Sequence, residues 1–347
     1  MRRRVGLLAC LLALGTGSGT SAMSAQGSAP TPASRVPVPE PTGRSLLVVI
    51  VGAAGEPQYA DAFHTAALAK VDAARTRFRL ADSDVVYLGE DPARAPTRIA
   101  ATSTKANVER TLTGLAARVH PGDQLWIVLI GHGSAEGAAS RFNVPGPDLS
   151  AADFARLLAP FARQQVAFVD ATSASADFVK TLAGPNRAIV TATKSPSERN
   201  VTRFARYFAD ALATPNADLD KDGGVSLLEA FTYARREVVR SYETENRMLT
   251  EHAQLDDDGD GVGADAPGVQ ANDGRLAATI VLGGVPATSD PRASALVARR
   301  RALEQQVADL RRRRESMDST VYLQQLETVL VDLSRTAHTI RAMEVKP

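Results

Sequence analysis

Apolar runs alternate with amphipathic stretches along residues 45–200. Five runs are nearly continuous in aliphatic and aromatic residues: SLLVVIVG (45–52), DVVYLG (84–89), QLWIVLIGHG (124–133), QVAFVDA (165–171) and RAIVTATK (187–194). Intervening stretches such as 59–78 and 104–119 carry apolar residues at helical spacing. Continuous apolar strands that alternate with helices are typical of a mostly parallel sheet with helices on both faces. The pattern therefore predicts an α/β fold.

A different pattern begins after Pro291. Leu296, Leu303, Leu310 and Met317 recur every seven residues. A second apolar stripe comprises Leu323, Leu326, Leu330, Leu333, Ala337 and Ile340. These two stripes, separated by the polar run RRRRESMDST, predict a C-terminal α-helical hairpin or a short coiled coil over residues 288–347. We expect these helices to serve assembly, including self-association.

The first 44 residues have the composition of an export signal followed by a linker. Residues 1–24 combine a basic start with a short apolar run and small residues, which describes a secretory signal peptide. Residues 25–44 are rich in proline and small residues and are expected to form an extended linker. The protein is therefore expected to be exported, to the periplasm or outside the cell. The motif LLAC resembles a bacterial lipoprotein box, so peripheral membrane anchoring is expected only if Cys10 is lipidated.

Net charge and cysteine content exclude several functions for the predicted main domain, residues 45–287. The 347 residues carry a formal net charge of +1, which argues against nucleic acid as the main partner. Cys10 is the single cysteine and lies within the predicted signal peptide. A mature chain without it would have no disulfide, no thiolate metal site and no cysteine nucleophile.

Chemistry-bearing residues follow the ends of two predicted strands. His132 and Gly133 end the run 124–133, while Asp170, Thr172 and Ser173 lie at the end of 165–171 and just beyond it. Parallel strands present their carboxyl ends at one edge of a sheet. We therefore expect His132 and Thr172 to lie close together, with the backbone N–H of Gly133 facing the same cleft.

The order of these motifs resembles the legumain and caspase clan, especially legumains and the catalytic subunit of the GPI transamidase. IGHGS (130–134) precedes FVDATSAS (168–175), and IVTATKSPSERN (189–200) follows. The lead-in VIVGAAGEPQYADAFHTAA is also similar to the first strand and the tyrosine-histidine helix of that family. The resemblance covers residues 45 to 285 and implies a caspase-like, mostly parallel sheet sandwiched by helices, and a peptidase ancestry.

The resemblance assigns a role to each residue of the predicted cleft. His132 matches the general base, and Gly133 matches the glycine whose N–H helps to form the oxyanion hole. Asp170 matches an acid that shapes the substrate pocket. Thr172 stands at the nucleophile position, where the clan has cysteine, and Ser173 is the nearby alternative.

An alcohol at the nucleophile position changes what the site can do. A cysteine needs only a modest lowering of its thiol pKa, whereas an alcohol needs an oriented base and a complete oxyanion hole. One interpretation is a pseudoenzyme that binds a protein or peptide partner, in which Thr172, Ser173 and Ser175 cap the following helix. The alternative is an active hydrolase that uses Thr172 or Ser173 with His132. A third is a calcium-responsive interaction protein in which the cleft has no role.

A calcium-binding loop is predicted at DLDKDGGVSLLE (218–229), which has the spacing of an EF-hand-type loop. The candidate ligands in order along the loop are Asp218, Asp220, Asp222, Gly224 through its carbonyl, Ser226 and Glu229. Alternating carboxylates of this kind converge on one hard cation, and Gly223 permits the sharp turn between them. The predicted cofactor is Ca²⁺.

A second acidic stretch, DDDGDGVG (256–263), begins the same pattern with Asp256, Asp258 and Asp260. In a loop over 256–267 the last position would be Pro267, which offers no side-chain ligand, so Asp265 would have to substitute. Calcium binding and a disordered acidic linker both remain open for this segment.

Overall fold

The computed structural model describes residues 43–137, 139–220, 223–269 and 271–283. In the C-terminal part it describes residues 292, 295, 296, 299, 300, 302, 303, 306, 307 and 310, and then 313–344. The predicted signal peptide, Cys10 and the linker up to residue 42 lie outside the described residues. None of the described helices combines the length and the hydropathy needed to cross a membrane.

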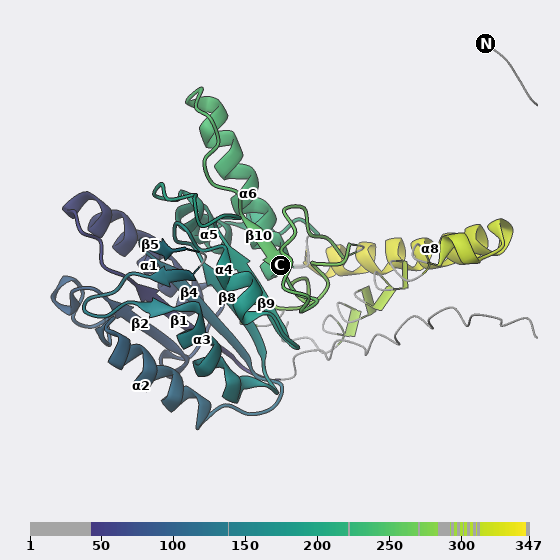
Figure 1. Cartoon of the computed structure of the whole chain (residues 1–347). Coiled ribbons are helices and arrows are strands. Elements are labelled where there is room, and N and C mark those ends of the chain that lie inside the picture. The colour runs from purple at the N-terminus through teal and green to yellow at the C-terminus, as the bar shows by residue number, and fades with distance from the viewer. Residues whose placement is uncertain are drawn as a thin grey trace, which may run out of the picture. The chain divides into compact units, whose positions relative to one another are not determined.

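A seven-stranded sheet forms the centre of the main domain, in the order β10-β9-β8-β4-β1-β2-β3 (Figure 1). Its strands are β1 (Ser45–Val51), β2 (Val85–Gly89), β3 (Ala101–Thr102), β4 (Gln124–Ile130), β8 (Gln165–Asp170), β9 (Arg187–Thr191) and β10 (Gln254–Asp256). Every pairing is parallel except that of β10 with β9. The predicted α/β fold with a mostly parallel sheet is confirmed, and the antiparallel edge strand β10 is an addition to it.

Helices cover both faces of this sheet (Figure 1). One face packs against α1 (Pro57–Thr76), α5 (Phe204–Ala213) and α6 (Leu227–Thr244). The other packs against α2 (Lys105–Ala116), α3 (Ala151–Leu158) and α4 (Asp177–Leu182). Successive residues of β1 alternate between the two apolar clusters, with Leu47 in the first and Leu46 in the second. Because both faces are buried, the strands read as continuous apolar runs rather than as alternating patterns.

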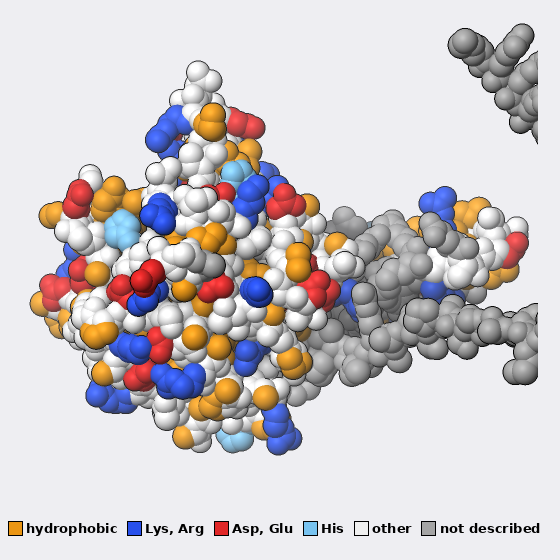
Figure 2. Space-filling view, in the orientation of Figure 1, with side chains coloured by type: hydrophobic (Ala, Val, Ile, Leu, Met, Phe, Trp, Pro, Cys, Tyr) orange, Lys and Arg blue, Asp and Glu red, His pale blue; other side chains and the backbone are white. Residues whose placement is uncertain are grey.

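Short elements complete the main domain. A small antiparallel sheet follows β4 and consists of β5 (Gly133–Glu136), β6 (Ala139–Phe142) and β7 (Leu149–Ser150). Short 3-10 helices of the main domain lie at Asp82–Asp84, Pro92–Arg94, Ala159–Phe161 and Pro215–Ala217, and another lies in the C-terminal part at Arg314–Ser316. On the face shown in Figure 2, acidic and basic side chains are interspersed rather than gathered into one patch of a single sign.

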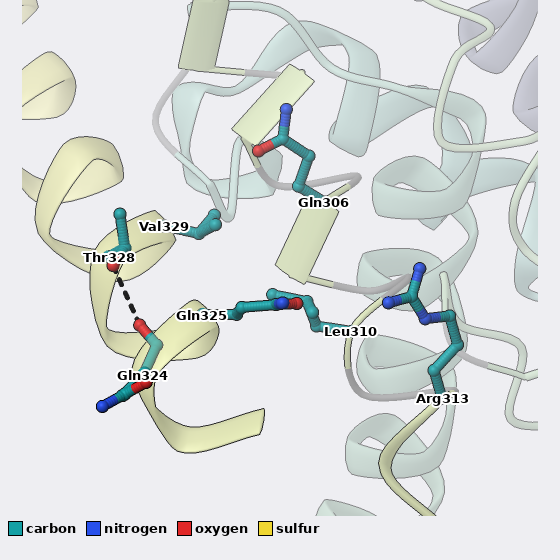
Figure 3. Close-up of a pocket in the computed structure, with 7 residues that line it drawn as sticks. All are labelled: Gln306, Leu310, Arg313, Gln324, Gln325, Thr328 and Val329. Atoms are coloured by element: carbon teal, nitrogen blue, oxygen red, sulfur yellow. Dashed lines mark hydrogen bonds between the residues drawn. The ribbon is translucent and has the colours of Figure 1, made fainter. Parts of the chain in front are cut away.

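The C-terminal part contains α8 (Ser319–Glu344), and the described residues from 295 to 310 are also helical. Leu303, Leu310 and Ile340 are buried, and Arg299 pairs with Asp332 at 3.6 Å, so the two helical segments contact each other. An open cleft of about 470 Å³ lies between them, and Figure 3 shows the side chains that line it. The lining residues are Gln306, Leu310, Arg313, Gln324, Gln325, Thr328 and Val329.

Candidate functional site

β4 and β8 are parallel neighbours, with Leu129 opposite Asp170, so their ends deliver the predicted site residues to one edge of the sheet. Gly133 lies directly against the turn that follows β8. Its N–H donates to Ser173 Oγ at 3.2 Å, and Ser173 Oγ donates to the Gly133 carbonyl at 3.0 Å. A Cβ atom on Gly133 would lie 2.6 Å from Thr172 Oγ1 and nearer still to the carbonyl oxygen of Ser173. Only glycine fits at this contact.

The Thr172 side chain is directed into the protein. Its Oγ1 donates to Asp170 Oδ1 at 2.6 Å, and its backbone N–H donates to the same oxygen at 3.0 Å. The residue is fully buried, with 0% of its surface exposed. The hydroxyl at the nucleophile position is therefore held by the neighbouring acid and is closed to solvent.

Asp170 is also fully buried. Its Oδ2 has no hydrogen-bond partner among the described residues, while Oδ1 accepts both bonds from Thr172. Burial disfavours the charged form and raises the pKa of Asp170 to about 7, although the Thr172 hydrogen bonds act in the opposite direction. A substantial fraction of this carboxyl group is therefore neutral at physiological pH.

The His132 ring is held by a different part of the molecule. Its Nε2 lies 3.0 Å from the backbone oxygen of Ala54, and Tyr59 and Phe63 of α1 pack edge-on against it at 4.9 and 5.1 Å. Because a carbonyl oxygen only accepts, Nε2 carries the proton and Nδ1 is the basic nitrogen. Across the described residues, no hydrogen bond joins His132 to the Thr172 hydroxyl. The structure thus brings the two strand ends together without pairing the base with the alcohol.

The expectation that Thr172, Ser173 and Ser175 cap the next helix is wrong. α4 begins at Asp177, and Ala176 at its N-cap makes no side-chain capping bond. Ser175 instead bonds Thr193 beyond β9, through its N–H at 2.8 Å and its Oγ at 3.0 Å. The chain between strand and helix is long enough for each of the three hydroxyls to reach a partner within the turn or on a neighbouring segment.

The acidic loop between α5 and α6 gathers its carboxylates. One carboxylate oxygen each from Asp218, Asp220 and Glu229 lies within 4.8 Å of the others. Asp218 Oδ2 also accepts from Gly223 N–H at 3.0 Å, and Gly223 has a positive φ of 85° that glycine adopts readily. Asp222 lies outside the described residues.

Glu229 closes the same loop from the start of α6. Its Oε2 accepts from the N–H and Oγ of Ser226, both at 2.8 Å, in a capping box. Its Oε1 accepts from Leu219 N–H at 2.8 Å and Asp220 N–H at 3.2 Å. The Ser226 side chain and both oxygens of the Glu229 carboxylate are therefore held by hydrogen bonds within the loop and the cap.

The second acidic stretch forms a hydrogen-bonded turn directly after β10. Asp256 Oδ2 accepts from Gly261 N–H at 2.6 Å, as Asp218 does from Gly223 in the first loop. Carboxylate oxygens of Asp256, Asp258 and Asp260 also lie within 4.8 Å of one another. Burial is the main cause that raises the pKa of Asp256. Asp265 does not belong to this cluster of described residues.

Two features were missed from the sequence. His252 Nδ1 lies 2.6 Å from Glu198 Oε1, and the Glu198 carbonyl accepts from Ala174 N–H at 2.8 Å beside the turn after β8. Lys70 of α1 is fully buried and donates to the Ala205 carbonyl at 2.9 Å, and desolvation lowers its pKa to about 7. Both pairings join residues more than 50 positions apart, and no local motif marks either of them.

No protein-family model matches the chain, and neither does any curated protein. Among solved structures, the chain is similar to the Drosophila initiator caspase Dronc, with 8% identity and a TM-score of 0.39 over 61% of this chain and 78% of that one. It is also similar to protein GSU0716 from Geobacter sulfurreducens, with 12% identity and a TM-score of 0.40 over 62% of this chain and 93% of that one. These are likenesses of fold, and no residue role is taken from them.

Proposed function

We propose that this chain is an exported, calcium-binding protein of caspase-like fold that lacks peptidase activity and binds a protein or peptide partner. The observation that carries this proposal is that the alcohol and the oxyanion donor are both engaged elsewhere, and that no hydrogen bond pairs the histidine with the alcohol among the described residues. Thr172 Oγ1 bonds buried Asp170, and His132 Nε2 bonds the Ala54 carbonyl. Gly133 N–H, the expected oxyanion donor, is bonded to Ser173 Oγ.

These engagements remove catalysis for distinct physical reasons. An alcohol becomes a nucleophile only when a base accepts its proton, and Asp170 Oδ1 already holds the Thr172 hydroxyl in a buried, low-dielectric setting. An oxyanion donor must point at the position where negative charge develops. The Gly133 N–H points instead at Ser173 Oγ, which accepts its hydrogen bond. The same Oγ donates to the Gly133 carbonyl, so Ser173 is also poorly placed to act as the alternative nucleophile of an active hydrolase.

Activity profiling of the exported protein on a broad peptide library tests this proposal. We expect no hydrolysis by the wild type, by His132→Ala or by Thr172→Cys, because a thiol at position 172 would remain buried against Asp170. Hydrolysis by the wild type that disappears in His132→Ala would refute the pseudoenzyme proposal. Hydrolysis gained in Thr172→Cys alone would mean that the inactive wild type lacks only its nucleophile.

The calcium part of the proposal rests on loop 218–229. Three carboxylates whose oxygens gather within 4.8 Å repel one another, and oxygen donors of this kind are the ligands that Ca²⁺ prefers. The backbone turn at Gly223 and the position of Glu229 at the start of α6 agree with the expected order of ligands. Extracellular calcium sites work with dissociation constants of about 10⁻⁴ to 10⁻³ M, so an exported protein needs only weak affinity.

Isothermal titration with CaCl₂ and thermal unfolding in calcium or chelator test this site. At a calcium concentration of 100 times Kd, binding should stabilise the fold by about 2.7 kcal/mol. Asp218→Asn combined with Glu229→Gln should abolish this response, because it removes two ligand charges at nearly constant volume. Asp256→Asn in the second acidic turn is the matched control, and a response lost only in that variant would move the site to residues 256–260.

Export is tested separately by N-terminal sequencing of the secreted or periplasmic protein. We expect cleavage near residue 24 and a mature chain without Cys10. A chain that retains Met1 inside the cell would contradict this part of the proposal, and a lipid-modified Cys10 would replace a soluble exported form with an anchored one.

A further inference from the structure

Arg300 of the C-terminal helical segment contacts the acidic loop. Its Nη2 lies 3.4 Å from Asp220 Oδ1, and its Nη1 donates to the Asp220 backbone oxygen at 3.4 Å. Only 5% of the Arg300 side chain is exposed. The adjacent Arg299 behaves differently, because 63% of its side chain is exposed and it pairs with Asp332 of α8.

A buried guanidinium needs a negative partner, since arginine keeps its charge at any physiological pH and burial of an unpaired charge is costly. The loop has the complementary need, because Asp218, Asp220 and Glu229 bring three carboxylates together. Arg300 therefore supplies positive charge to the same three carboxylates that we propose as calcium ligands.

We propose that Arg300 is an intrachain counter-cation of loop 218–229, and that it competes with Ca²⁺ for Asp220. This inference rests on the calcium site proposed above. Ca²⁺ bound to Asp220 would lie within a few ångströms of the buried Arg300 guanidinium, and two cations at that distance repel each other. Calcium binding and docking of the C-terminal helical segment on the loop consequently oppose each other.

Arg300 could instead strengthen calcium binding, so the direction in which its loss changes calcium affinity decides between the two roles. An arginine that only orients Asp220 would act as an outer-shell partner, and its loss would weaken metal binding. An arginine that competes with the metal would, when removed, tighten metal binding. By linkage, calcium must then weaken the docking of the helical segment by the same factor.

Isothermal titration of the full chain with CaCl₂ distinguishes these cases. Arg300→Gln should bind calcium roughly tenfold more tightly than the wild type, a typical size for coupling between two sites. Arg299→Gln is the matched control and should leave Kd unchanged, because Arg299 pairs with Asp332 away from the loop. An unchanged or weakened affinity in Arg300→Gln overturns the competition.

Hydrogen exchange on the wild type gives a second test that needs no substitution. Calcium should accelerate amide exchange in residues 295–310 relative to α2, which packs on the opposite face of the sheet. If calcium leaves amide exchange in residues 295–310 unchanged or slower relative to α2, the proposed competition is wrong. If the wild type binds no calcium, the proposed calcium site itself fails, whereas calcium binding with unchanged affinity in Arg300→Gln refutes the competition alone.

Discussion

The turn after β8 and the acidic loop before α6 are both hydrogen-bonded polar segments, but only the loop gathers three carboxylates at close range. In the turn, Thr172 bonds Asp170 and Ser173 bonds Gly133, so hydroxyls and backbone groups satisfy one another. In the loop, the described carboxylates gather at close range, with buried Arg300 against Asp220. A segment that has the residues of a site is able to act only if the fold leaves them available.

The motif order in the turn resembles a peptidase clan, yet its groups form a closed structural unit. The acidic loop has no catalytic motif, but it brings three carboxylates together, with Arg300 against Asp220. Substitutions in the two segments should therefore differ in their effects on stability and on the response to calcium.

Gly133→Ala should have the largest effect. The new Cβ would lie 2.6 Å from Thr172 Oγ1 and would overlap the Ser173 carbonyl, so β5 and the turn would have to separate. We expect a loss of stability on the order of 5 kcal/mol, measured by urea unfolding. Gly114→Ala is the control, because that helical position has open space and should gain about 1 kcal/mol. A Gly133→Ala protein of normal stability would mean that the turn is loosely packed.

Asp170→Asn should change the pH dependence of stability. The folded state holds the Asp170 proton up to a pH of about 7, whereas the unfolded carboxyl has an ordinary pKa of 3.8. Between these values the unfolded state binds fewer protons, so this group makes the wild type less stable as the pH rises.

From pH 5 to pH 8 the wild type should lose at most about 3 kcal/mol relative to Asp170→Asn, measured by urea unfolding at each pH. Asp177→Asn, at the first residue of α4, is the control and should follow the wild-type profile. Parallel profiles for the wild type and Asp170→Asn would show that the carboxyl is ionised and solvated.

Much of the sheet could be predicted because its strands are buried on both faces. β1, β4 and β8 lie within continuous apolar runs that the sequence marks clearly. β10 has three residues, and β5 contains Gly133, Ser134 and Glu136, so neither shows an apolar run. Such short strands are fixed by their neighbours rather than by their own composition.

The candidate site was predictable where its residues are local in sequence, or where they follow adjacent parallel strands, as Gly133 and Ser173 do. The candidate ligands of the acidic loop fall within 12 consecutive positions, so their spacing predicted that their carboxylates converge. The His132 ring, in contrast, is oriented by Ala54 and α1, and Arg300 reaches Asp220 from 80 positions away. The sequence gives no signal for either contact, because both depend on how distant helices pack.

Glu229→Ala should have an intermediate effect that reports on the loop. Without calcium it should lower stability by about 1 to 2 kcal/mol, because it removes the capping box and the acceptor of two loop N–H groups. Glu229→Gln retains an acceptor and should cost less. Both variants should lose the calcium-dependent rise in Tm, measured by calorimetry in calcium and in chelator. A rise that persists in Glu229→Ala would place the metal elsewhere.

Ser173→Ala should have the smallest effect, and it tests the turn most directly. The substitution removes two hydrogen bonds with Gly133 but leaves the neighbouring apolar packing and Thr172 in place. A neutral hydrogen bond contributes about 1 kcal/mol to stability. Ser195→Ala is the control and should cost less, because the hydrogen bond of Ser195 with Ser197 is exposed and water replaces it. If Ser173 only closes the turn, its loss should lower stability by about that amount in urea unfolding and leave peptide hydrolysis absent. Hydrolysis by the wild type that vanished in Ser173→Ala while stability stayed constant would instead make Ser173 a nucleophile, and the turn would then be as open as the loop.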